Sequence, residues 1–179
     1  KDITISLSLE KYLGKELDDQ KLKAYFEQNK AVYDETEVKA SHVLVDTRTM
    51  KTDEELAQAK DKINKAKADV VAGKDFADIA KQYSDCPSKE KGGDLGFFKR
   101  KGQMVEPFAA AAFALKIGQI SDPIKTNFGY HIIKVTEIKQ GKDVKFDDIK
   151  QNVKQDILQE KAQVLISQLR QKAKIDIKA

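Results

Sequence analysis

Cysteine is almost missing from this sequence of 179 residues, which contains Cys86 as its single cysteine, two histidines and no tryptophan. One thiol cannot form an internal disulfide, and it cannot supply the several cysteines of a structural zinc site. The two histidines, His42 and His131, are far apart in the sequence and make a weak case for a metal site. We therefore expect neither a metal nor another cofactor.

Long hydrophobic runs and an excess of one charge are also missing. No apolar run approaches the roughly 20 residues of a membrane-spanning helix, so we expect a protein that is not transmembrane. The 33 Lys and Arg residues and the 29 Asp and Glu residues are mixed along the chain. A nucleic-acid-binding surface would show clustered basic residues, so we expect no nucleic-acid partner. The chain begins at Lys1 without a signal peptide, which indicates a processed product or an excised fragment.

Glycine is concentrated in one part of the chain, because five of the nine glycines lie in residues 92–118. Residues 92–96 lack the Lys-Ser/Thr pair of a phosphate-binding loop and the spacing of a dinucleotide fingerprint. Glycine lets the backbone turn sharply, and large apolar side chains beside such turns can form a pocket. The large apolar residues of this stretch are Leu95, Phe97, Phe98, Met104, Phe108 and Phe113.

The spacing of apolar residues predicts the order of helices and strands. Apolar residues at alternate positions predict strands, and apolar residues three and four apart predict helices. Pro107 fits the first position of a helix, Asp75 fits a helix N-cap, and Gly73 fits the position that follows a helix end. The expected strands are 3–9, 38–46, 95–100 and 130–138, with a short extended segment ending near Thr126 and a closing strand at 175–177. The expected helices are 18–33, 56–70, 76–83, 107–115 and 146–172.

Residues 37–139 are expected to form one domain, because this block of about 100 residues alternates helices and strands. The flanks, 1–36 and 140–179, are each too small to hold a core and are expected to pack on each other. Their terminal strands, 3–9 and 175–177, could pair within one chain. If they pair between two chains, the result is a swapped homodimer.

The two histidines are predicted to face the apolar side of their strands. His42 alternates with Ala40 and Leu44, and His131 alternates with Ile133. If the strands are neighbours, the rings can meet, and a ring or a hydroxyl such as that of Thr126 can satisfy them. On the residues alone, a satisfied buried pair is the ordinary interpretation, and a Cys86–histidine nucleophile pair is the alternative.

Eight short motifs follow one another between residues 38 and 138. They are Ala40-Ser41-His42-Val43-Leu44-Val45, Phe76-Ala77-Asp78-Ile79-Ala80, Ser84-Asp85-Cys86, Gly92-Gly93-Asp94-Leu95-Gly96, Gly102-Gln103-Met104-Val105, Pro107-Phe108, Ala112-Phe113-Ala114-Leu115 and Phe128-Gly129-Tyr130-His131-Ile132-Ile133. In order and spacing they resemble the parvulin family of peptidyl-prolyl cis/trans isomerases. The flanks are similar to those of secreted bacterial foldases of the SurA and PrsA type.

The resemblance implies an α+β fold of the order β-α3-β-α-β2, with a four-stranded antiparallel sheet and flanking helical segments from both termini. It implies an apolar proline pocket with Phe128 at the rim, where related enzymes often have serine, and it assigns Phe97, Phe98 and Phe113 to the core behind the pocket. The implied proline-binding residues are Leu95, Met104 and Phe108, and the implied polar network is His42, Cys86, Thr126 and His131.

The implied activity is isomerisation of X–Pro bonds in unfolded exported proteins, together with folding-chaperone activity, in the bacterial periplasm or cell envelope. The alternative is a peptide-binding chaperone whose isomerase activity is incidental. The position of Cys86 is Asp in other parvulins, so we expect non-covalent catalysis. Residues 46–53 hold two basic and two acidic residues, so we expect no requirement for a phosphorylated residue before proline.

Overall fold

The computed structural model describes residues 17–172, and the expected strands 3–9 and 175–177 lie outside the described residues. The chain divides into two compact units. One unit is Ala31–Lys142, and the other consists of the described parts of Lys1–Lys30 and Asp143–Ala179. Within residues 17–172, no helix combines the length and the hydropathy needed to cross a membrane.

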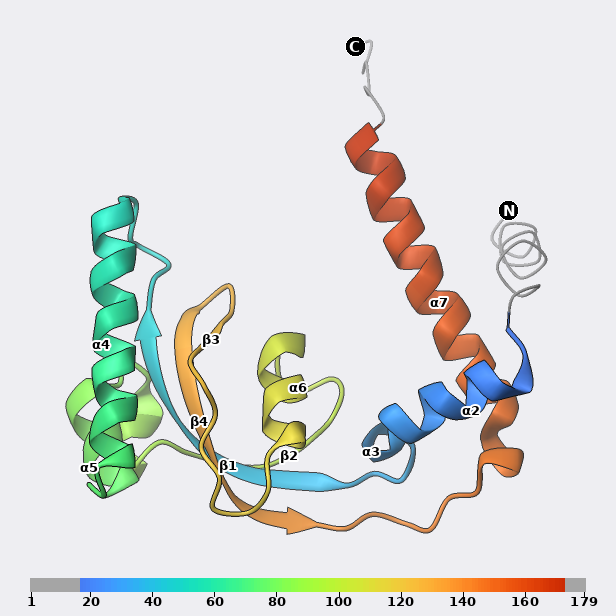
Figure 1. The fold of residues 1–179 in the computed structure, drawn as a ribbon, viewed down its shortest axis with the longest axis horizontal. Helices are drawn as coiled ribbons and strands as arrows, with labels where there is room; N and C mark the ends of the chain where they lie inside the picture. The colour runs from blue at the N-terminus through green and yellow to red at the C-terminus, as the bar shows by residue number, and fades with distance from the viewer. Residues whose placement is uncertain (1–16, 173–179) are drawn as a thin grey trace. The chain divides into compact units, whose positions relative to one another are not determined.

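The larger unit contains a four-stranded antiparallel sheet, which confirms the predicted fold class (Figure 1). The strand order is β2-β1-β4-β3. The central pair runs from Glu37 opposite Lys139 to Asp46 opposite Gly129, with one irregularity near Lys39. The strands are β1 (Glu37–Asp46), β2 (Asp94–Lys99), β3 (Ile124–Lys125) and β4 (Gly129–Lys139).

Local sequence signals set the helix boundaries in this unit. Thr52 and Glu55 form a reciprocal capping box at the start of α4, and Asp75 accepts hydrogen bonds from two backbone amides at the start of α5. Pro107 is the second residue of α6 instead of the first, because Glu106 begins the helix. The helices are α4 (Asp53–Val71), α5 (Phe76–Tyr83), the 3-10 helix η2 (Pro87–Lys91) and α6 (Glu106–Ala114).

The smaller unit is built from α2 (Asp19–Gln28) and α7 (Phe146–Lys172), and α7 has the predicted boundaries. The rings of Phe26 and Phe146 lie 5.9 Å apart between their centroids. The helix predicted over residues 18–33 is interrupted at Asn29, which corrects the prediction. Asn29 leaves the helical conformation and its side-chain amide donates to the carbonyl of Tyr25, so α2 ends there and the short α3 (Lys30–Tyr33) follows.

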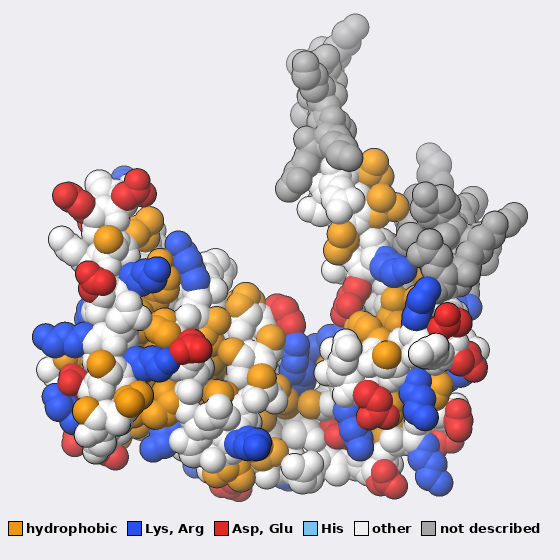
Figure 2. All heavy atoms as spheres, in the orientation of Figure 1, with side chains coloured by type: hydrophobic (Ala, Val, Ile, Leu, Met, Phe, Trp, Pro, Cys, Tyr) orange, Lys and Arg blue, Asp and Glu red, His pale blue; other side chains and the backbone are white. Residues whose placement is uncertain are grey.

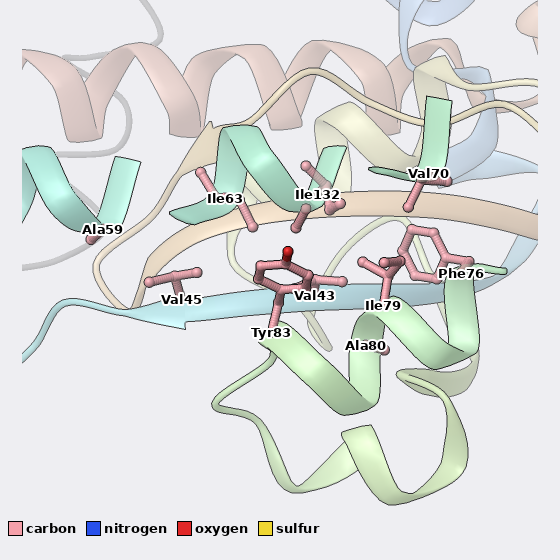
Figure 3. Close-up of a cluster of buried hydrophobic side chains, with 11 residues drawn as sticks. Val43, Val45, Ala59, Ile63, Val70, Phe76, Ile79, Ala80, Tyr83 and Ile132 are labelled. Atoms are coloured by element: carbon pink, nitrogen blue, oxygen red, sulfur yellow. The ribbon is translucent and has the colours of Figure 1, made fainter. Parts of the chain in front are cut away.

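One face of the sheet, here called the closed face, carries Val43, Val45 and Ile132. Helices α4 and α5 cover it, and Figure 3 shows Ile63 of α4 and Ile79 of α5 reaching toward these strand residues. Both isoleucines are essentially inaccessible to solvent. This face is therefore a continuous apolar core.

The opposite face, here called the open face, carries Ala40, His42, Leu44, His131 and Ile133. Helix α6 lies on this side of the sheet (Figure 1), and its Phe108 and Ala112 pack on the strands. Lys, Arg, Asp and Glu side chains are interspersed over the side of the molecule seen in Figure 2, as the mixed charges of the sequence predict.

The three phenylalanines assigned to the core do not share one environment. Phe98 is buried and Phe113 packs against it, with ring centroids 6.1 Å apart, as predicted. Phe97 is 39% exposed, so its core assignment was wrong. Successive side chains of a strand point to opposite sides, so the register that buries Phe98 turns Phe97 outward.

Candidate active site

A pocket of about 420 Å³ opens on the open face of the sheet. Its volume lies in the range of pockets that hold small organic groups. Its wall is mainly apolar, and its polar groups come from the strands and from the loops beside them. The lining residues are His42, Leu44, Asp46, Arg48, Asp85, Cys86, Pro87, Leu95, Gln103, Met104, Val105, Phe108, Phe128 and His131.

The register of β1 and β4 brings the two histidines together. Leu44 lies opposite His131 and His42 lies opposite Ile133, so the two histidines are diagonal neighbours on one face. Their rings are stacked, with centroids 5.5 Å apart and an interplanar angle of 26°. Both side chains are buried, at 6% and 4% exposure. The expected meeting of the rings is thus present in the structure.

Hydrogen-bond contacts extend the histidine pair at both ends, so that four side chains form one hydrogen-bond chain. The Nδ1 atoms of His42 and His131 are 3.3 Å apart, and Nε2 of His131 lies 2.9 Å from Oγ1 of Thr126. At the other end, Nε2 of His42 lies 3.2 Å from Oγ of Ser88. The sequence pattern identified Thr126 as a partner and missed Ser88, since no periodicity relates a residue of η2 to a residue of β1.

The histidine pair is neutral near pH 7. Burial lowers the pKa of His42 to about 4. The pKa of His131 is also lowered to about 4, first by burial and then by the neighbouring His42, while Asp46 opposes this shift. Each neutral ring has one donor nitrogen and one acceptor nitrogen, so the pair can form a directed hydrogen bond without a net charge.

The apolar wall comes from the glycine-containing stretch. Leu95 belongs to β2, Met104 lies in the turn before α6, and Phe108 lies in the first turns of α6. The ring of Phe108 meets the two histidines nearly edge-on, at centroid distances of 5.7 and 5.4 Å. Phe108 is 3% exposed, while Leu95 and Met104 are half-buried and leave apolar surface toward the cavity. All three predicted proline-binding residues therefore line the same pocket.

Cys86 lines the pocket but stands apart from the histidine chain. It is half-buried, and its backbone N–H donates to Oγ of Ser84 at 3.3 Å. The hydrogen bonds of His42 go to His131 and Ser88. The structure therefore does not form the Cys86–histidine pair that a nucleophilic mechanism would need.

Phe128 and Arg48 shape the rim of the pocket. Phe128 is 37% exposed, and the guanidinium of Arg48 lies over its ring, 5.6 Å from the centroid. Arg48 is also bound to the Asp46 carboxylate through several hydrogen bonds, and these lower the pKa of Asp46. The positive charge of Arg48 is thus matched by the carboxylate of Asp46, the last residue of β1.

Gly93 allows the loop after η2 to reach the histidine strand. The His42 N–H donates to the carbonyl of Gly93 at 2.9 Å. Gly93 has a φ of +82°, and a Cβ atom there would lie 2.3 Å from the carbonyl oxygen of His42. A side chain at this position would force the loop away from β1. The Gly92-Gly93 pair could be seen in the sequence, but its close approach to His42 could not, because that contact exists only in the folded sheet.

Comparisons with known proteins agree with the architecture. The family model described as Rotamase, PPIC-type PPIASE domain, matches residues 42–137, which is more than half of the chain. Foldase protein PrsA 1 of Bacillus cereus is 43% identical over 162 residues, covering 90% of this chain and 49% of that protein. Foldase protein PrsA of Bacillus subtilis is 41% identical over 166 residues, covering 89% and 50%.

A solved structure extends the likeness to three dimensions. The crystal structure of the peptidylprolyl isomerase PrsA from Bacillus anthracis matches with a TM-score of 0.55 at 34% identity. The match covers 99% of this chain and 75% of that chain. The chain spans about half the length of the curated relatives it matches.

Proposed function

The chain belongs to the PPIC-type peptidyl-prolyl isomerase family, and on that premise we propose that it catalyses cis/trans isomerisation of X–Pro bonds in unfolded polypeptides. The observation that carries this proposal is the position of the neutral histidine pair at the base of an apolar pocket. In this proposal Leu95, Met104 and Phe108 hold the proline ring, and the rim residue Phe128 contacts the substrate beside it.

The rate acceleration that such a site must provide is modest. Rotation about an X–Pro bond is opposed by roughly 18–20 kcal/mol because the amide is stabilised by resonance. An acceleration of about a thousandfold needs about 4 kcal/mol of preferential binding to the twisted amide. An apolar wall excludes water from the amide carbonyl and so weakens the charge separation that stabilises the planar form. The pocket can therefore act without a covalent step.

The polar groups supply the remaining stabilisation. His42, His131 and Thr126 present fixed dipoles beside the amide, and fixed dipoles stabilise a transition state without the cost of reorganising solvent. Cys86 contributes polarity to the wall and does not form a bond with the substrate. We propose that His42, His131 and Thr126 form the network that stabilises the twisted amide, with Cys86 as a neighbouring polar group of the pocket wall.

The similarity to PrsA foldases supports a wider role for the whole protein. We propose that it helps exported proteins to fold in the bacterial periplasm or cell envelope, with residues 37–139 as the isomerase domain. Residues 1–36 and 140–179 would form a chaperone-like domain and could exchange between two chains in a homodimer. The separation of Ala31–Lys142 as a compact unit supports this domain division.

The isomerase proposal is tested by a protease-coupled assay on a short peptide that contains Ala-Pro-Phe. We expect the full chain to accelerate the cis-to-trans step well above the uncatalysed rate, which has a time constant of tens to hundreds of seconds. The exposed Phe97→Ala variant is the matched control and should keep full activity. A rate equal to the uncatalysed background for the folded chain would refute the enzymatic proposal.

A second candidate function is a chaperone in which isomerisation is incidental. The exposed apolar residues Val164, Ile166 and Leu169 of α7 favour it, because such side chains can contact unfolded chains. The test compares aggregation suppression with isomerase activity in the double variant Met104→Ala/Phe108→Ala. Full suppression without activity would favour the chaperone, whereas parallel loss of both would favour the isomerase.

A further inference from the structure

Ser88 lies outside the pocket wall and still contacts the catalytic pair. It belongs to η2, and its hydroxyl oxygen is 3.2 Å from Nε2 of His42. The carbonyl of Ser88 accepts a hydrogen bond from the Gly93 N–H at 2.9 Å, and the Gly93 carbonyl accepts one from the His42 N–H at 2.9 Å. These bonds form a closed ring that fixes the Ser88 hydroxyl against one edge of the His42 imidazole.

The opposite end of the chain is fixed by Thr126. Thr126 is buried, at 8% exposure, and its hydroxyl oxygen accepts a hydrogen bond from the Phe128 N–H at 3.1 Å. The hydroxyl proton also needs an acceptor, because a buried donor without a partner is costly. Its other partner in the described structure is Nε2 of His131, at 2.9 Å. Thr126 therefore donates, and Nε2 of His131 accepts.

The direction of the first bond determines the others. A neutral imidazole has one N–H, so a proton-free Nε2 on His131 places the proton on Nδ1. Nδ1 of His131 then donates to Nδ1 of His42, 3.3 Å away. His42 in turn carries its proton on Nε2, which faces Ser88. The chain ends at the Ser88 hydroxyl, which is half-buried and can direct its own proton toward water.

We propose that Ser88 is a positioning residue that accepts the last hydrogen bond of a one-directional chain from Thr126 through His131 and His42. Its role is to hold His42 with the proton on Nε2 and His131 with the proton on Nδ1. The two ring dipoles at the base of the pocket then have one orientation. The consequence for catalysis rests on the proposed isomerase function, whereas the proton positions do not.

Removing the Ser88 hydroxyl should allow the chain to reverse. In Ser88→Ala the His42 Nε2–H loses its acceptor, so the current arrangement and the reversed one, in which His42 donates to His131, become comparable in free energy. In the reversed arrangement the Thr126 hydroxyl proton loses its acceptor instead, because Nε2 of His131 is then protonated. The ring dipoles would then fluctuate, and preorganised dipoles that fluctuate stabilise a transition state less well. We expect kcat/KM to fall about fivefold, the effect of losing one neutral hydrogen bond.

Nitrogen-15 NMR of the two imidazoles in the full chain tests the proposal. In the wild type we expect a protonated Nε2 on His42 and a protonated Nδ1 on His131. Ser88→Ala should shift both rings toward averaged tautomers, and Ser88→Thr should restore the wild-type spectrum and kcat/KM. Glu90→Ala, on the exposed side of the same short helix, is the matched control and should leave both unchanged. Ser88→Cys, with a weak acceptor of similar size, should give the same averaging if Ser88→Ala does not fold.

Two results would overturn the proposal. One is a wild-type spectrum with the proton of His42 on Nδ1, and the other is a Ser88→Ala spectrum identical to that of the wild type. These spectra need no substrate, so they separate this inference from the proposed function. A folded chain without isomerase activity that still shows the tautomer change would support the role of Ser88 and refute the isomerase.

Discussion

The two faces of the sheet are built from the same two strands and have opposite properties. On the closed face, Val43, Val45 and Ile132 are packed against α4 and α5 and are almost fully buried. On the open face, the alternate positions of the same strands carry His42 and His131 at the base of a pocket. Because strand side chains alternate, one strand pair can supply a dry core and a polar site at once.

The difference lies in the cover that each face receives. The closed face is covered by α4, with 19 residues, together with α5, whereas the open face is covered by α6, with 9 residues. Short α6 contributes small side chains, Ala109 and Ala112, beside Phe108. An incomplete cover leaves room for a ligand and lets buried polar groups reach it. The comparison shows that the pocket exists because the short α6 covers only part of the open face.

The largest expected effect is on the closed face. Ile63→Ala should lower the free energy of unfolding by about 4 kcal/mol, because it creates a cavity at a fully buried position. Denaturant unfolding measures this loss, and kcat/KM of the folded fraction should be unchanged. Val71→Ala on the same helix is the matched control, since Val71 is 71% exposed and should change stability by less than about 0.5 kcal/mol. A loss of activity in folded Ile63→Ala would contradict the separation of the two faces.

The next effect is a dependence of stability on pH that arises on the open face. The histidines have pKa values of about 4 in the folded chain, below the value of 6.5 of an unperturbed histidine. The unfolded chain therefore binds more protons between pH 6.5 and 4, so stability is retained above pH 6.5 and falls as the pH decreases through this range. We expect each of the two histidines to contribute a loss of about 2 kcal/mol between pH 7 and pH 5.

Denaturant unfolding at these two pH values measures that loss. The double variant His42→Leu/His131→Leu should lose less stability over the same pH range, because it lacks the two titrating histidines. The carboxylates are the same in both proteins and contribute equally. An equal loss in the two proteins would contradict the assignment of neutral buried histidines. Titration of the ring protons by NMR should give midpoints near pH 4 in the wild type.

A smaller effect is expected at the apolar wall of the pocket. Met104→Ala should lower kcat/KM about tenfold, because it removes part of the apolar surface that holds the proline ring. Met104 is half-buried and lies outside the closed face, so the free energy of unfolding should change by less than about 1 kcal/mol. The peptide assay measures the rate, and denaturant unfolding measures the stability. A Met104→Ala enzyme with wild-type kcat/KM would place the proline ring elsewhere.

The smallest effect is expected at the cysteine. Cys86→Ser should change kcat/KM by less than about threefold, because the thiol belongs to the pocket wall and not to the histidine chain. A nucleophilic cysteine would instead lose activity by several orders of magnitude on this change. The peptide assay with both proteins at equal concentration decides between the two outcomes.

Most elements of the fold could be predicted because their signals are local. The boundaries of α7, the Asp75 cap and the strand formed by Glu37–Asp46 each depend on residues a few positions apart. The errors arose where a local pattern allowed two outcomes. Asn29 interrupts an otherwise helical pattern, and Phe97 alternates with the buried Phe98 on an edge strand. A side-chain cap decides the first case and the strand register decides the second.

The sequence by itself determined most of the described secondary elements, the mixed surface charge and the family, because periodicity, capping residues and ordered motifs are properties of the linear chain. It also identified His42, His131 and Thr126 as residues that could meet. Only the tertiary structure decided that Ser88 completes their hydrogen-bond chain and that Cys86 stays outside it. The physical reason is that a hydrogen bond depends on distances within a few tenths of an ångström between distant segments. Those distances are set by strand register and by the close approach of Gly93 to β1.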